Sequence, residues 1–274
     1  FLVADPARQI VNVDSDFGRE LAERCGQEVI RVSMDAARID SGLPHVVLRA
    51  TASTGHGFDV SIASSWGEGR FSLPLHGEFN IANAALVLAF LLSDGVPLDT
   101  ASDALAAVKP PPGRLQRVDV DAGPTVFVDY AHTPAAVESA LDALRPHCDG
   151  ELWCVFGCGG DRDAGKRPLM GSVVERLADR VVVTNDNPRS EDPGQIIEAI
   201  LGGLEAPGSA TVIEDRGAAI AWTIGNAAAA DVVLLAGKGH ENYQVIGDER
   251  RDFSDYGVAA ASLAARKGHA EEGE

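Results

Sequence analysis

The sequence predicts an α/β protein whose second half forms a doubly wound parallel sheet. After residue 113, short apolar runs alternate strictly with longer amphipathic segments. The apolar run that ends at Phe156 breaks into a glycine-rich loop and is followed by a helix-like segment, which is the order of strand, turn and helix in such folds. Alternation of this kind implies parallel strands joined by right-handed crossovers.

The first 108 residues follow another pattern. Residues 45–75 carry alternating or β-branched side chains in segments broken by glycine, which predicts an antiparallel meander. The two asparagines Asn80 and Asn83 lead a long apolar helix, and as a purely local feature they are typical helix caps. The other expected elements are strands at 10–14 and 29–32 and helices at 16–25, 77–92 and 100–108.

The run Lys-Pro-Pro-Pro-Gly at 109–113 marks a domain boundary, because three consecutive prolines cannot continue a helix and they stiffen a connector. We therefore expect one domain at 1–108 and a second at 109–274. The elements expected in the second domain are strands at 125–129, 152–156, 181–184, 210–213 and 231–236, helices at 135–144, 168–178, 194–204 and 217–229, a polar hairpin through Glu249, and a last helix from Val258.

The two ends of the chain carry their own expectations. Phe1-Leu2-Val3 reads like the interior of a helix, and neither an initiator methionine nor a signal peptide precedes it. We therefore expect a piece of a longer polypeptide. The acidic tail after Gly268 is expected to fray.

The composition is that of a soluble globular protein, with 45% hydrophobic and 23% charged residues. No apolar run approaches the roughly 20 residues of a membrane span, so no membrane association is expected. The 41 acidic and 23 basic residues give a net charge of -18, which argues against nucleic acid as a partner, since phosphate backbones require basic patches. Arg162, Lys166 and Arg167 nevertheless share one loop, and this local excess of positive charge favours an anionic ligand there.

The four cysteines lack the paired spacing and the nearby histidines of a zinc site. Cys154 and Cys158 flank a predicted strand end. We expect them to be buried thiols of a cytoplasmic protein rather than a disulfide.

Five polar clusters occur at predicted strand ends or helix starts. They are Gly113–Arg114, Asp129–Pro134, Gly157–Arg167, Asp186–Arg189 and Gly237–Glu241. Each cluster taken alone is also compatible with a capped turn. Because the carboxyl ends of parallel strands share one edge of a sheet, however, the clusters together predict a binding site at that edge.

The side chains of these clusters are chemically complementary. Arg162 and Arg189 can each bind a carboxylate, and the amide of Asn187 can both donate and accept a hydrogen bond. Asp186 and Glu241 can hold an ammonium group. The pattern therefore predicts a site for a zwitterionic amino acid. His132 and His240 are equally well explained as hydrogen-bonded turn residues, and neither is assigned as a general base.

The glycine-rich loop at 157–167 does not have the spacing of a nucleotide-binding phosphate loop, and no Ser or Thr follows its lysine. The usual nucleotide-binding loop is absent from the rest of the sequence as well. A nucleotide site cannot be built from this chain by that loop.

Six motifs in order resemble those of the Mur ligases, and among them the diaminopimelate-adding type. They are GEFNIANA, PGRLQRV, VDYAHTP, GCGGDRDAGKRPLMG, TNDNPRSEDP and GKGHENYQ. The resemblance covers essentially the whole chain. It implies that 1–108 is the C-terminal part of the central ATPase domain and that 109–274 is the Rossmann-like C-terminal domain of the family.

The resemblance also implies roles for individual residues. Those implied to bind meso-diaminopimelate are Arg162, Asp186, Asn187, Pro188, Arg189, Gly237 and Glu241. Those implied to bind ATP are Asn80, Asn83, Arg114, Asp129, Tyr130 and His132. No catalytic residue and no metal ligand is assigned within the chain, because the family's phosphate loop and the carbamylated lysine that helps to bind magnesium are expected before Phe1.

The implied activity is ATP-dependent and Mg²⁺-dependent amide-bond formation in peptidoglycan precursor synthesis. A carboxylate of UDP-MurNAc-L-Ala-D-Glu is activated as an acyl phosphate, and the amine of diaminopimelate then displaces phosphate. A cytoplasmic, monomeric parent enzyme is expected, whereas the chain by itself is expected to be inactive. The alternatives are a lysine-adding or other Mur-type ligase, a folylpolyglutamate synthetase, and a non-catalytic amino-acid-binding fragment.

Overall fold

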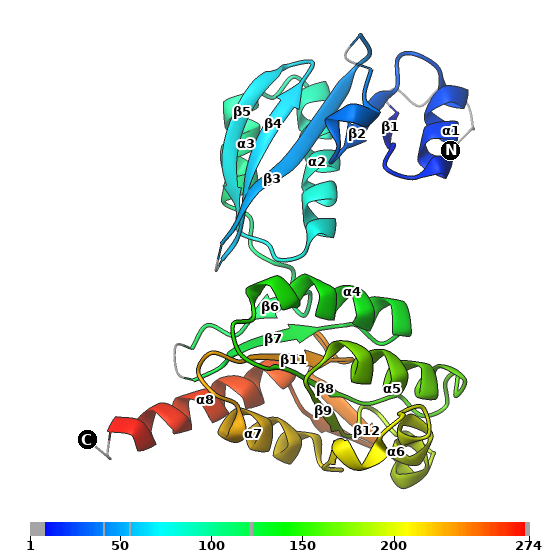
Figure 1. Ribbon diagram of the computed structural model, residues 1–274, viewed down its shortest axis with the longest axis vertical. Helices are drawn as coiled ribbons and strands as arrows, with labels where there is room; N and C mark the ends of the chain where they lie inside the picture. Colours follow the sequence, from blue (N-terminus) through cyan, green and yellow to red (C-terminus); the bar gives the residue numbers. More distant parts are fainter. Residues whose placement is uncertain (1–8, 41, 55, 121–122, 272–274) are drawn as a thin grey trace. The chain divides into compact units, whose positions relative to one another are not determined.

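The computed structural model describes residues 9–40, 42–54, 56–120 and 123–271, with no side-chain description for 268–271. The helix interior expected at 1–3 and the side chains of the acidic tail lie outside this description. The chain divides into two compact units, Phe1–Lys109 and Pro110–Glu274 (Figure 1). The division falls one residue after the boundary expected from the prolines.

The first unit contains a five-stranded sheet in the order β1-β2-β3-β4-β5. Its strands are β1 (Ile10–Asn12), β2 (Ile30–Ser33), β3 (His45–Thr54), β4 (Gly57–Ser64) and β5 (Gly67–Leu73). The first three strands run parallel, whereas β3, β4 and β5 form antiparallel hairpins. The expected antiparallel meander is therefore confirmed.

Two long helices of the first unit, α2 (Glu78–Ser93) and α3 (Leu98–Ala106), pack on this sheet. The unit also has α1 (Asp16–Cys25) and the short 3₁₀ turn η1 (Ala36–Arg38). Helix α2 is apolar on nearly all sides. Leu88 and Ala89 are fully buried, but Phe79, Val87 and Phe90 are 44%, 48% and 55% exposed. A helix with apolar residues on its exposed side is typical of one that is covered by further protein.

The second unit is a six-stranded sheet in the order β10-β9-β8-β11-β7-β6. Its strands are β6 (Gln116–Arg117), β7 (Thr125–Asp129), β8 (Leu152–Phe156), β9 (Arg180–Val183), β10 (Thr211–Val212) and β11 (Val232–Ala236). All neighbouring strands run parallel except β6, which pairs with β7 in the antiparallel sense. The predicted α/β fold with a doubly wound sheet is thus confirmed.

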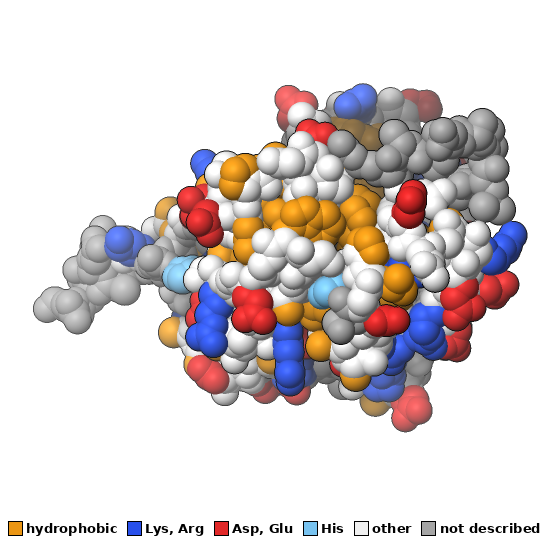
Figure 2. Space-filling model, turned by 90° about the horizontal axis from the view of Figure 1, so that it is seen from above, with side chains coloured by type: hydrophobic (Ala, Val, Ile, Leu, Met, Phe, Trp, Pro, Cys, Tyr) orange, Lys and Arg blue, Asp and Glu red, His pale blue; other side chains and the backbone are white. Residues whose placement is uncertain are grey.

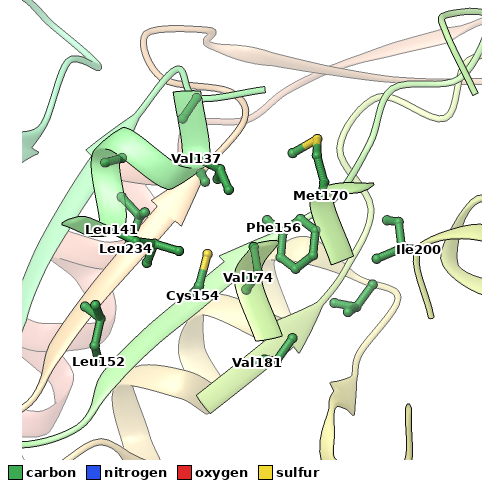
Figure 3. Packing of buried hydrophobic residues seen from close by; sticks show 14 of the residues in the cluster. Val137, Leu141, Leu152, Cys154, Phe156, Met170, Val174, Val181, Ile200 and Leu234 are labelled. Atoms are coloured by element: carbon green, nitrogen blue, oxygen red, sulfur yellow. The ribbon is translucent and has the colours of Figure 1, made fainter. Parts of the chain in front are cut away.

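Helices cover both faces of this sheet. They are α4 (Pro134–Leu144), α5 (Lys166–Leu177), α6 (Pro193–Leu201), α7 (Arg216–Asn226) and α8 (Asp255–Glu271), with 3₁₀ turns η2 (Arg145–His147) and η3 (Pro207–Ser209). One core lies between the sheet and α4, α5 and α6, and the other between the sheet and α7 and α8. Figure 3 shows the first core, where side chains of β8 meet those of the helices, among them Phe156, Val137, Val174 and Ile200.

Several element boundaries differ from expectation: α3 and α5 begin two residues earlier, and α7 ends at Asn226 rather than 229. Three further differences have a local cause. The edge strand β6 was missed because two residues are too short for a periodic signal. The last helix begins at Asp255 rather than Val258, because the Ser254 hydroxyl caps it by accepting a hydrogen bond from the Gly257 N–H. Helix α6 ends at Leu201, before two glycines, rather than at 204. The expected polar hairpin is present as β12 (Tyr243–Ile246) and β13 (Glu249–Asp252).

Side chains of all types mix on the face seen in Figure 2. Hydrophobic side chains group near its centre, and Lys and Arg side chains lie close to Asp and Glu side chains around them. On this face the acidic excess of the sequence is therefore interspersed with basic groups. Among the described residues, no helix combines the length and the apolarity that a bilayer crossing would require.

Candidate functional site

The polar clusters of the second unit meet at one edge of its sheet. Four of them follow the carboxyl ends of the parallel strands β7, β8, β9 and β11. The fifth cluster, at Gly113, reaches the same edge, since a Cβ at Gly113 would lie only 2.1 Å from the backbone nitrogen of His240. Gly113 also has φ of +66°, a conformation that glycine adopts without strain. The five clusters therefore lie together at one edge of the sheet, as the sequence predicts.

The loops after β8 and β9 are locked together by their backbones. The Gly160 N–H donates to the Asn187 carbonyl at 2.9 Å, and Arg189 Nη1 donates to the Gly160 carbonyl at 2.7 Å. A Cβ on Gly160 would lie 1.9 Å from the Pro188 carbonyl oxygen. The glycines thus allow close contact between two loops of the protein, and the backbone of the glycine-rich loop is used for that contact.

Arg189 is held in an unusual conformation. Its φ is +52°, which is uncommon for a residue with a side chain. The hairpin β12–β13 fixes it, because the Arg189 N–H donates to the Val245 carbonyl and the Gly247 N–H donates to the Arg189 carbonyl. Of its guanidinium, only Nη1 has a hydrogen-bond partner among the described residues. The remaining donors can bind a ligand carboxylate.

Arg162 lies near Arg189 on the exposed side of the loop. A Cβ built on Gly159 would be 2.9 Å from Arg189 Nη1 and 3.7 Å from Arg162 Cγ. The structure therefore brings the two arginines of the predicted site together around one glycine.

Lys238 lies at the centre of the site and is fully buried. Its Nζ donates to Asn187 Oδ1 and to Glu241 Oε2, both at 3.2 Å, and lies 3.6 Å from Asp186 Oδ1. The Asn187 amide also donates to Glu241 Oε2, at 2.9 Å. Three residues of the predicted site are thus joined by a lysine that lies in one of the polar clusters but is not among the residues predicted for the site.

Asp186 is buried beside this lysine, and its surroundings differ from those of Glu241. Burial raises the pKa of Asp186, whereas Arg216 and Lys238 lower it. Its Oδ1 has an ion pair with Lys238 but no hydrogen bond within the described part of the chain. Glu241 is partly exposed and has no recorded partner for Oε1 among the described residues. Glu241 is therefore the carboxylate that a ligand ammonium can reach.

The side chains expected at the nucleotide lie in two places. Asp129 is buried and accepts hydrogen bonds from the Leu115 N–H at 2.7 Å and the Ala131 N–H at 2.8 Å. Burial raises the pKa of Asp129, and these two N–H donors lower it. Arg114 is exposed with its guanidinium 5.0 Å from the centre of the Tyr130 ring, and the His132 ring contacts the same tyrosine. This group presents an exposed guanidinium held against an aromatic ring, and a guanidinium is a suitable partner for a phosphate.

Asn80 and Asn83 belong to the first unit, at the start of α2. Asn80 Nδ2 donates to the His76 carbonyl, and Asn83 Nδ2 donates to Asn80 Oδ1. Neither is the N-cap residue of the helix, which is Gly77. The local interpretation of these asparagines as helix caps is therefore wrong.

The cysteines are unpaired thiols, and Cys154 and Cys158 are buried, as expected. Burial raises the pKa of Cys158 to about 11. Across the described residues, no three His, Cys, Asp or Glu side chains gather in a way that could hold a metal ion.

Comparisons with known proteins agree with one another. Residues 113–239 match the model of the Mur ligase, glutamate ligase domain. The chain is 44% identical over 268 residues to a UDP-N-acetylmuramoyl-L-alanyl-D-glutamate–2,6-diaminopimelate ligase of Synechococcus sp. (strain WH7803), covering 96% of this chain and 52% of the relative.

Solved structures of such ligases are also similar to this chain. A structure of a UDP-N-acetylmuramoyl-L-alanyl-D-glutamate–2,6-diaminopimelate ligase has a TM-score of 0.69 and 34% identity, over 94% of this chain and 53% of that one. Folylpolyglutamate synthase of Mycobacterium tuberculosis, solved with ADP and AMPPCP, has a TM-score of 0.57 and 26% identity, over 85% and 48%. The chain spans about half the length of the relatives it matches.

Proposed function

Because the chain belongs to the Mur ligase family, we propose that it is part of a ligase that joins meso-diaminopimelate to UDP-MurNAc-L-Ala-D-Glu. The reaction forms an amide bond at the expense of ATP, in the synthesis of peptidoglycan precursors. By this proposal the enzyme works as a monomer in the cytoplasm, and cell shape and division depend on its product. Its partners are small-molecule substrates rather than nucleic acid or membrane.

One observation carries the choice of amino acid. Asn187 contacts both the positive and the negative part of the site. Its backbone carbonyl lies 3.4 Å from Arg189 Nη1, and its side-chain amide donates to Glu241 Oε2 at 2.9 Å. A diaminopimelate has one more carboxylate than lysine. The free donors of Arg189, with Arg162 close by, suit that carboxylate, and Glu241 suits the ammonium group beside it.

The remaining residues of the predicted site support these contacts. Asp186 lies behind Glu241 as a partner of Lys238. Pro188 packs against Gly160, and Gly237, with φ of +116°, lets the chain pass close to the Asp186 carboxylate. Lysine would leave the guanidinium of Arg189 without its carboxylate, and a site built for a polar group rejects ligands that lack it.

ATP supplies the phosphoryl group that activates the substrate carboxylate. In this chain the exposed guanidinium of Arg114 would bind a phosphate, and Tyr130 and His132 would support it. Asp129 holds the turn that carries Arg114 through its bond to the Leu115 N–H. We also propose that Asn80 and Asn83 contact the adenine. Mg²⁺ would accompany ATP, but the described residues offer no cluster of ligands for it, so no residue of this chain is assigned to the ion.

The exposed apolar side of α2 supports the proposed domain assignment. Phe79, Val87 and Phe90 form an apolar surface on a helix of the first unit. This suits a first unit that is the C-terminal part of a larger ATP-binding domain, with the second unit as the amino-acid-binding domain.

The test is an assay of the complete ligase with meso-diaminopimelate and with lysine as alternative acceptors. We expect amide formation with diaminopimelate and a kcat/KM for lysine lower by a factor of about 10⁴. Comparable use of both acceptors, or use of lysine or glutamate alone, would replace the proposed substrate by that of another ligase of this family. Calorimetry of the 274-residue chain with each amino acid, with and without ATP, shows whether its site forms without the rest of the enzyme.

A further inference from the structure

The buried lysine at the centre of the site has three polar partners on two segments of the chain. Asp186 and Asn187 follow β9, whereas Glu241 lies with Lys238 in the loop between β11 and β12. Its ammonium group is fully buried, and a buried ammonium costs several kcal/mol unless it is paired and hydrogen-bonded. Lys238 therefore either stabilises only the fold or also organises the site around it.

The hydrogen bonds of Asn187 show what the lysine does to the site. Asn187 Oδ1 accepts from Lys238 Nζ at 3.2 Å and from the Val245 N–H at 3.0 Å. With two donors on the amide oxygen, the Asn187 Nδ2 group must point the other way, and it donates to Glu241 Oε2. Lys238 and the Val245 N–H therefore together determine which end of the Asn187 amide faces Glu241.

The same lysine acts directly on Glu241. Glu241 Oε2 accepts from both Lys238 Nζ and Asn187 Nδ2, while Oε1 has no partner in the described part of the chain. One oxygen is thus fixed and the other remains available. The charges also favour this arrangement, because one ammonium between the carboxylates of Asp186 and Glu241 leaves a single negative charge for a ligand.

We infer that Lys238 is a positioning residue for the amino-acid substrate: it orients the amide of Asn187 and the carboxylate of Glu241 so that Glu241 Oε1 receives the substrate ammonium. This inference rests on the proposed function, because it takes that site to be the amino-acid site. It adds a residue that touches no substrate and acts through two that do.

A double-mutant cycle in the complete ligase tests the inference. The variants are Lys238→Met, Glu241→Gln and the two together, and the readouts are KM for diaminopimelate and KM for ATP. We expect Lys238→Met to raise KM for diaminopimelate about 10-fold or more, with KM for ATP changed less than about 2-fold. In the Glu241→Gln background, Lys238→Met should raise KM for diaminopimelate much less, because the carboxylate that Lys238 orients is already absent.

A purely structural lysine gives a different result. It would change both KM values in parallel, and its effect would be the same with Glu or Gln at 241, so either finding overturns the inference. Lys267→Met, at an exposed position of α8, is the matched control and should leave both KM values unchanged. If Lys238→Met does not fold, the double variant, which has one carboxylate fewer beside position 238, is compared with Glu241→Gln. If the double variant has a KM for diaminopimelate close to that of Glu241→Gln, the inference is supported. If both its KM for diaminopimelate and its KM for ATP are higher than those of Glu241→Gln by the same factor, the inference is contradicted.

The same series separates this inference from the proposed function. If the wild-type ligase does not use diaminopimelate, the proposed substrate is wrong before any variant is compared. If the wild type uses it and the cycle is additive, only the role of Lys238 is wrong.

Discussion

At the scale of single residues, the neighbouring glycines Gly159 and Gly160 differ in what a side chain at each position would contact. A Cβ on Gly159 would meet the end of the Arg189 side chain at 2.9 Å, whereas a Cβ on Gly160 would meet the Pro188 carbonyl oxygen at 1.9 Å. A guanidinium at the end of a flexible side chain can move aside. A backbone carbonyl in a locked pair of loops cannot, so the two substitutions should have different consequences.

We expect Gly159→Ala to displace Arg189 and to raise KM for diaminopimelate about 10-fold in the complete ligase, with little loss of stability. Gly160→Ala should instead lower the free energy of unfolding of the chain by about 1–3 kcal/mol in urea, because the loops must separate. Gly208→Ala, whose Cβ has nothing within 4 Å, is the matched control and should change neither quantity. Equal loss of stability for the variants at 159 and 160 would show that Arg189 cannot move as supposed.

Arg189 itself gives the most direct test of the residue assignments. Its free donors face no other partner in the described part of the chain, so Arg189→Ala should raise KM for diaminopimelate about 100-fold and leave KM for ATP nearly unchanged. Arg176→Ala, which breaks an exposed ion pair with Glu138, is the control. Equal effects on both KM values would reject the assignment of Arg189 to the amino-acid site.

The sequence supports the prediction of the site's residues better than the prediction of their environments. The edge location of the clusters follows from strand alternation alone, and that is why Arg189, Asn187 and Glu241 could be grouped. Lys238 could not be recognised as buried, because a lysine between two glycines has the pattern of an exposed turn. The pairing of Asp186 with that lysine depends on loops that follow different strands, and no local pattern reports it.

At the scale of elements, a buried ion pair joins two helices to the strands that carry the site. Arg216, the first residue of α7, forms two hydrogen bonds with Asp255, the first residue of α8, and both side chains are fully buried. The same guanidinium donates to the backbone carbonyl of Asn185, which follows β9, and to that of Ala236, the last residue of β11. Arg216 therefore ties the helix starts to the loops that present Asp186 and Lys238.

We expect Arg216→Met to lower the free energy of unfolding by about 3–5 kcal/mol, because it leaves the Asp255 carboxylate buried without a partner. Arg216→Met with Asp255→Leu should recover a large part of this loss. Urea unfolding of the chain measures both. Arg180→Met breaks an exposed pair with Glu151 and should have little effect. A double variant no more stable than the single one would show that the backbone carbonyls, and not Asp255, dominate the role of Arg216.

The elements were predictable where the signal is local. Buried parallel strands are continuous apolar runs, so β7, β8, β9 and β11 were found within one or two residues. The start of α8 was missed because its cap, Ser254, precedes the apolar stretch by several residues. The strand order of the sheet depends on contacts between distant segments, for example β11 inserted between β7 and β8, which a single sequence does not specify.

At the scale of the whole molecule, the two units differ in how completely they bury their apolar residues. The second unit has cores on both faces of its sheet, closed by α4 to α6 on one side and by α7 and α8 on the other. The first unit has one large core and a small cluster beside α1, and its helix α2 exposes Phe79, Val87 and Phe90. The second unit therefore meets the physical requirement for a domain that folds alone, and the first does so only in part.

We expect residues 110–274, produced without the first unit, to fold and to unfold in urea in one cooperative transition, since their two cores are complete. Residues 1–109, produced alone, should bind more of a hydrophobic dye such as ANS per molecule than residues 110–274 do. The reason is that Phe79, Val87 and Phe90 are not covered within the first unit. Replacement of these three residues by serine in the short fragment should reduce the dye binding. A second unit that fails to show a cooperative transition would mean that its cores depend on the first unit, and the boundary at Lys109 would then separate parts of a single folding domain.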